Sequence, residues 1–317
     1  MHSTPAARAE STTLAQPLSA ADMLPFYEAQ DAVTSVPASN PPATIPAPTA
    51  DALRSAGDFE ISFSPALWMS RVRADTSLNG PTFTVDDQLG LNGYEATFNG
   101  ELSASWGLFY KVMLTGWFFS TDAATSATAA GAFGAVNIAV GDRLSNRFSA
   151  AGAGGEFDVT LWQPFADQQF PWASKVVNAK NTASDGWYKA DLRIKAIGAV
   201  RWYSAQLSVN DLTAGTSASW SMDAVMPGLG GGFEIDFNMA DHVSWLDSIR
   251  LEASGLMGTN FTNEQYFLAA RAGLSFMFTR NCGVEFGYRL EDFKLNNNSA
   301  IFDGGVQGLF VGMNVKF

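Results

Sequence analysis

From Asp58 to the C-terminus, apolar and polar residues alternate in short segments. A period of two places successive side chains on opposite faces of a β-strand, whereas a helix would need a period near 3.6. The pattern therefore predicts an all-β fold, an antiparallel up-and-down barrel of about ten strands, with eight or twelve as alternatives. The ten segments are 58–72, 92–106, 107–119, 154–165, 188–206, 224–238, 247–258, 265–279, 284–294 and 305–317.

The polar faces of these segments decide between two kinds of barrel. A soluble barrel turns its charges outward and packs large aliphatic side chains inside. Here acidic and basic residues occur in near balance on the polar faces, among Gly, Ser and Thr, which suits a narrow lumen filled by ion pairs. We therefore predict a transmembrane barrel and keep a soluble periplasmic barrel as the alternative. The predicted lumen charge network is Glu101, Lys111, Asp158, Arg193, Arg201, Glu234, Arg250, Glu252, Arg271, Glu285 and Arg289.

The links between segments support a membrane barrel, because such barrels have short periplasmic turns and longer outer loops. Alternate links are short at 106–107, 239–246 and 280–283, and long at 73–91, 120–153, 207–223 and 295–304. Link 166–187 is long where a short turn is expected, and 133–140 could form a hairpin above the membrane. Several tryptophans lie near the segment ends, where an interfacial girdle would put them, and core packing explains each of them equally well: Trp68, Trp106, Trp117, Trp187, Trp202 and Trp245.

Residues 1–57 differ in composition from the barrel segment, 58–317. Eight of the thirteen prolines lie in the first 48 residues, mixed with Ala, Ser and Thr, which predicts a disordered N-terminal segment. Its apolar island at 23–27 could dock on a periplasmic partner. The first twenty residues lack the apolar core of a signal peptide, so an export signal would have been removed or would lie upstream.

Charge and cysteine content exclude several classes of function. The net charge is −12 with only 19 Lys and Arg, which argues against nucleic-acid binding. A single cysteine, Cys282, excludes an intramolecular disulfide framework. The chain contains neither a phosphate-binding glycine motif nor histidine metal spacing, so we expect no cofactor and no metal.

The last ten residues, Gly308-Leu309-Phe310-Val311-Gly312-Met313-Asn314-Val315-Lys316-Phe317, resemble the terminal strand of bacterial outer-membrane proteins. That resemblance implies location in the outer membrane, contact with its lipid and lipopolysaccharide, and recognition by the barrel-assembly machinery through Phe317. Residues 188–317 also look like the back half of the small OmpA/opacity-like barrels, with Gly198-Ala199-Val200-Arg201-Trp202-Tyr203 and Gly287-Tyr288-Arg289 as recurrent motifs.

Catalysis is disfavoured because hydrolases of barrel form need a base that titrates near neutral pH. The two histidines are His2, in the N-terminal segment, and His242, on a predicted periplasmic link where strand geometry would not bring Asp241 and Ser244 together. The acidic outer residues are expected to be solvated, with divalent cations bridging lipopolysaccharide as the alternative: Asp86, Asp87, Asp142, Asp211 and Asp223. We predict a non-enzymatic barrel with an envelope-structural or surface-interaction role. A small porin-like diffusion channel is the main alternative, and an outer-membrane hydrolase the least favoured.

Overall fold

The computed structural model describes residues 59–107, 109–163, 189–240, 243–261 and 264–317, and all regular elements in these ranges are β-strands. In this part of the chain no helix is long and apolar enough to span a membrane. The predicted N-terminal segment, 1–57, lies outside the described residues. The strands are β1 (Phe59–Leu78), β2 (Phe83–Thr84), β3 (Glu95–Trp106), β4 (Tyr110–Ser126), β5 (Gly131–Phe133), β6 (Val136–Ile138), β7 (Arg143–Trp162), β8 (Lys189–Asp211), β9 (Thr216–Asn238), β10 (Ser248–Thr259), β11 (Tyr266–Thr279), β12 (Cys282–Asn296) and β13 (Ala300–Lys316).

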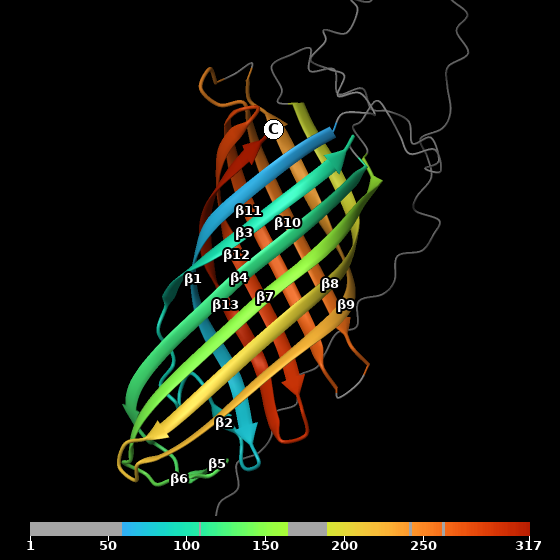
Figure 1. Ribbon diagram of the computed structural model, residues 1–317. Helices are drawn as coiled ribbons and strands as arrows, with labels where there is room; N and C mark the ends of the chain where they lie inside the picture. Colours follow the sequence, from blue (N-terminus) through green and yellow to red (C-terminus); the bar gives the residue numbers. More distant parts are fainter. Residues whose placement is uncertain (1–58, 108, 164–188, 241–242, 262–263) are drawn as a thin grey trace, which may run out of the picture. The chain divides into compact units, whose positions relative to one another are not determined.

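Ten of these strands form a closed antiparallel barrel (Figure 1). Each pairs with its neighbour in the order β1-β3-β4-β7-β8-β9-β10-β11-β12-β13, and β13 pairs with β1 to close the ring. The closing register runs from Ser62 opposite Lys316 to Leu78 opposite Ala300. At its end, the N–H of Phe317 donates to the carbonyl oxygen of Ile61 at 2.8 Å. The predicted barrel of about ten strands is confirmed, with ten.

Several strands are longer than predicted, and two predicted loops are wrong. Residues 120–153 contain the end of β4, the β5–β6 hairpin and the first half of β7, and residues 207–223 contain only a short turn at 212–215 between β8 and β9. The hairpin at 133–140 is present as β5 and β6.

The alternation continues through these regions, but its polarity inverts. On β8 the even-numbered positions change from apolar before Ser204 to polar after it, while the odd-numbered positions change from charged to apolar. The predicted segments assume a polar inner face, so they end where the inner face becomes apolar. The inner face of the strand therefore changes from polar to apolar along its length, and the outer face changes in the opposite sense.

Candidate functional site in the barrel lumen

The lumen near the termini of the described barrel, Phe59 and Phe317, is filled by an ion-pair cluster centred on Glu234 of β9. Its carboxylate contacts Arg193 at 2.8 Å, Arg250 at 3.2 Å and Lys195. Asp236, two residues along the same inner face, accepts from Arg193 at 2.6 Å and from Arg250 at 2.7 Å. Each buried charge therefore has opposite charges beside it, which is the condition under which such groups persist away from water.

A second cluster lies further along the lumen and is centred on Glu101 of β3. Glu101 contacts Arg271 and, at 3.3 Å, Arg289. Arg271 also reaches Glu285 and, at 3.2 Å, Glu252. These contacts join β3, β10, β11 and β12 across the barrel interior.

Arg289 lies where the second ion-pair cluster meets the apolar part of the lumen. Its Nη2 lies 2.7 Å from Glu291, its Nη1 donates to the Asn99 side chain at 2.8 Å, and its guanidinium lies over the Trp68 ring at 5.7 Å from the ring centroid. Tyr203 donates to Glu291 at 2.7 Å. The charged and aromatic parts of the lumen therefore meet at Arg289 and Tyr203.

All eleven predicted network residues lie on inner faces of the barrel, and nine of them belong to the ion pairs of the described residues. Lys111 and Asp158 stand directly opposite each other in the β4–β7 register and line the remaining cavities, but they do not join these pairs. Oδ1 of Asp158 is buried without a hydrogen-bond partner. The other charged residues of these lumen ion pairs were also placed on the polar face by the alternation of the sequence: Glu60, Glu156, Asp191, Lys195, Asp236, Glu291 and Lys316.

The space between the charged side chains is small and polar. One cavity of about 80 Å³ reaches from Glu60 and Lys316 to Glu101, and a second of about 60 Å³ continues to Glu291. Such polar cavities have room for a few water molecules. They do not continue into the other half of the barrel.

The other half of the lumen is an apolar core built mainly from aromatic rings. Tyr203 stacks on Phe293 with a centroid distance of 4.7 Å, and Phe302 lies 5.1 Å from Phe293 and 5.2 Å from Phe148. Further buried members are Trp68, Trp117, Phe119, Trp220, Phe267, Leu207, Val209 and Leu295. The predicted charge-filled lumen is therefore corrected: charge fills the half near the termini, and packed rings fill the other half. Trp68 and Trp117 face this core and not the predicted girdle.

Loops close the barrel above the aromatic core. Buried side chains from the β1–β3 link and from the β5–β6 hairpin pack onto it, and Asn146 on β7 donates to the carbonyl oxygen of Leu89 at 2.8 Å. The members of this cap are Phe83, Val85, Leu89, Leu91, Phe133, Val136 and Ile138.

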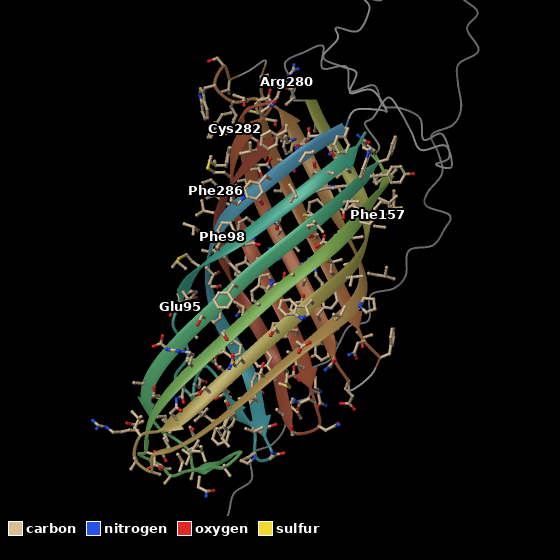
Figure 2. The ribbon with its side chains drawn as sticks, viewed as in Figure 1. Glu95, Phe98, Phe157, Arg280, Cys282 and Phe286 are labelled. Atoms are coloured by element: carbon tan, nitrogen blue, oxygen red, sulfur yellow. The ribbon has the colours of Figure 1, made fainter. Side chains whose placement is uncertain are left out.

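The outer face of the barrel carries a continuous apolar band around the charged half. On β9, Leu229 is 74% exposed, and Phe98, Phe157 and Phe286 project from three other strands (Figure 2). Beyond Val225 the outward positions of β9 become serines and Asp223. An exposed apolar band around a polar lumen would be unstable in water and is the arrangement of transmembrane barrels.

This is an outer-membrane β-barrel.

The band also orients the barrel. On the side of the aromatic core, long parts of the chain extend beyond the edge of the apolar band: residues 70–95, 119–150 and 203–224. On the side of these termini the links are short: β3 ends at Trp106 and β4 begins at Tyr110, and β11 ends at Thr279 and β12 begins at Cys282. Short turns face the periplasm, so the aromatic half lies outside the outer membrane. Link 166–187, which includes Trp187, lies outside the described residues, as does His242.

Beyond the band, outward polar residues interact on the barrel surface. Tyr266 at the start of β11 donates to Asp303 of β13 at 2.8 Å. Partial burial and this hydrogen bond raise the pKa of Tyr266 to about 12, because both favour the neutral phenol. Lys294 lies 4.0 Å from the same carboxylate.

Comparison with solved structures finds other outer-membrane barrels at low similarity. The attachment invasion locus protein Ail of Yersinia pestis aligns with 11% identity and a TM-score of 0.34, covering 82% of this chain and 99% of Ail. The outer-membrane protease OmpT of Escherichia coli aligns with 11% identity and a TM-score of 0.41, covering 82% and 98%. The sequence matches no protein-family model and no curated protein. Likeness at this level carries no functional inference, and the barrel's own apolar band and polar lumen are what mark it as a membrane barrel.

Proposed function

We propose that this barrel is a non-conducting, non-enzymatic protein that holds a rigid interaction surface above the outer membrane. The observation that carries the proposal is the aromatic core, which fills the lumen of the outer half from wall to wall. A close-packed core gives the extended strands the rigidity of a protein interior. The surface-interaction role follows because the ordered structure beyond the membrane is larger than anchoring requires.

The main alternative, a small diffusion channel, needs a water-filled path through the barrel. The polar cavities end at Tyr203 and Arg289, against packed rings. Opening a path would require several aromatic side chains to leave a packed core, at a cost of roughly 3–5 kcal/mol for each ring removed from its contacts. An occluded lumen is therefore favoured.

Single-channel recording tests the proposal. The purified barrel in planar bilayers is expected to show no steady conductance, because the apolar core excludes water and ions. A known open porin reconstituted by the same procedure is the control. Steady, reproducible current steps from the purified barrel would contradict the proposal that the lumen is occluded and would favour a diffusion channel.

The absence of catalysis is part of the proposal. Both histidines lie outside the described residues, and the part of the chain that the structure describes contains no group of three metal-ligating side chains. A hydrolase dependent on His242 would lose turnover of lipid or peptide substrates in His242→Ala. Activity that is present in the wild-type barrel and lost in this variant would contradict the proposal.

The partners also remain proposals. Phe317 is 75% exposed at the closing seam, where an assembly factor could reach the last strand. We propose recognition of this strand by the barrel-assembly machinery, contact of the band with lipid and lipopolysaccharide, and a periplasmic partner for the N-terminal segment. Membership of the OmpA/opacity-like family stays a prediction; OmpA- and OmpX-type barrels have eight strands, and this barrel has ten.

A further inference from the structure

The wall of the outer half is incomplete between β1 and β4. β3 pairs with β4 only from Trp106 opposite Tyr110 to Asn99 opposite Trp117, while β4 continues to Ser126. β7 covers the other edge of β4 along its whole length. The outer part of β4 therefore has a paired edge and an edge from which the neighbouring strand has departed.

The direction of the backbone groups on this edge follows from the β4–β7 register. Ala127 donates to the carbonyl oxygen of Asp142 at 2.8 Å, and at the other end of β4 Thr160 donates to that of Phe109 at 2.8 Å. In an antiparallel pair alternate residues bond to the same neighbour. Odd-numbered residues therefore bond to β7, and even-numbered residues direct their N–H and C=O groups to the side that β3 has left.

Three residues on this edge keep unpaired main-chain groups: Ser120, Asp122 and Ala124. Among the hydrogen bonds of the described residues, none involves their N–H or C=O groups on this side. Their side chains are exposed on the outer face, beyond the apolar band. We call this stretch, Ser120–Ala124, the open β4 edge.

The chain that replaces β3 lies against the inner side of β4. A Cβ built at Gly90 would lie 3.0 Å from Cβ of Thr125, and the Thr121 hydroxyl donates to Glu95 at 3.2 Å. Thr121 and Thr125 are inward-facing, so segment 85–94 contacts the inner face of β4 without pairing with its edge. Glu95, labelled in Figure 2, is the first residue of β3.

Natural sheets protect free edges with lysine, proline or bulges, because an unpaired edge is a template for another strand. The open β4 edge has none of the three and carries a single charge, Asp122. We propose that it takes up an extended peptide segment of an extracellular protein as an added antiparallel strand. The main chain supplies the recognition, as in other cases of β-strand addition. This inference deepens the proposed interaction role and names its site.

Amide hydrogen exchange of the barrel in detergent tests the edge directly. The amides of Ser120, Asp122 and Ala124 are expected to exchange fast, while those of Thr121 and Ala123, bonded to β7, exchange slowly. Slow exchange of the three edge amides in the barrel alone would overturn the proposal, because the edge would already be covered. Protection that appears only as the barrel concentration rises would also overturn it, in favour of pairing between two copies.

The added strand is tested with a synthetic nine-residue peptide that copies residues 143–151, the segment of β7 that pairs with the other edge of β4. The peptide is expected to slow exchange of the three edge amides by at least ~10-fold, about 1.4 kcal/mol of protection. The same peptide N-methylated at alternate residues, which lacks the required donors, is expected to have no effect. Equal protection by both peptides, or by neither, would overturn the proposal.

A variant pair assigns the effect to the backbone. Ala124→Pro removes one edge N–H but spares the β7 ladder, and it is expected to abolish peptide protection. Ala124→Ser keeps the N–H and is expected to bind as the wild type does. If Ala124→Pro does not fold, Ser120→Pro serves in its place. Peptide protection that survives loss of the N–H overturns the proposal. A conducting barrel would refute the occluded function without altering these exchange rates, so the two failures are distinguishable.

Discussion

At the scale of single residues, several charges in the lumen are held by more than one partner. Arg289 is the clearest case, since it contacts Glu101, Glu291 and Asn99 and covers the Trp68 ring. Exchanging a whole buried ion pair for apolar residues is often neutral, but removing one partner leaves an uncompensated charge. The network therefore makes the barrel sensitive to single substitutions.

Arg289→Met is expected to destabilise the barrel by roughly 3–5 kcal/mol, because Glu101 and Glu291 would lose a shared cation in a buried site. Urea unfolding in lipid vesicles measures the change. Arg147→Met is the control: this arginine is exposed beyond the band, and its loss is expected to cost less than about 1 kcal/mol. Equal effects of the two substitutions would contradict a special role for the buried network.

At the scale of elements, the strands interlock through large side chains facing glycines on the next strand. Trp117 on β4 stands opposite Gly152 on β7, and a Cβ at Gly152 would overlap the indole ring. Gly198 on β8 is different, because a Cβ there would have no neighbour within 4 Å. One glycine is thus required by packing inside the barrel, and the other is not.

Gly152→Ala is expected to destabilise the barrel by about 1–3 kcal/mol, because the added methyl group overpacks the core beside Trp117. Gly198→Ala is expected to change the free energy of unfolding by less than about 0.5 kcal/mol. Both are measured by the same urea unfolding experiment. A larger cost at Gly198 than at Gly152 would show that the packing around Trp117 is not what fixes the β4–β7 pair.

At the scale of the whole molecule, the barrel has two halves with opposite distributions of polarity. In the half near the termini the outside is apolar and the inside charged; in the other half the outside is polar and the inside apolar. One half therefore behaves as a membrane barrel and the other as a soluble β-barrel built on the same strands. The loop cap and the open β4 edge both belong to the second half.

Depth-dependent quenching tests this division. In a Cys282→Ser background, fluorescent labels are placed at Leu229→Cys and at Ser221→Cys, two outward positions on β9. A quencher in the lipid phase is expected to act on the label at position 229, and a water-soluble quencher on the label at position 221. If the aqueous quencher reached both labels equally, the apolar band would not lie in lipid, and the soluble barrel would gain support.

The sequence alone determined the strand class and the inner position of the charges, because a period of two is a local property of the chain. It predicted about ten strands with eight or twelve as alternatives, and the closed sheet has ten. The inversion on β8 beyond Ser204 is also visible in the sequence. The predicted segment ended near this point because it assumed that the polar face stays inward. Trp68 and Trp117 illustrate the same limit: their positions near segment ends are typical of a girdle, but their parity places them inside.

Only the tertiary structure decided how the inner side chains meet. Strand register decides which arginine pairs with Glu101 and where β3 separates from β4. The place where aromatic rings close the lumen depends on side chains from segments far apart in the sequence. Alternation fixes the face of a side chain, but it carries no information about its neighbour across the barrel. The closed sheet supplies that neighbour, and with it the difference between an open channel and an occluded one.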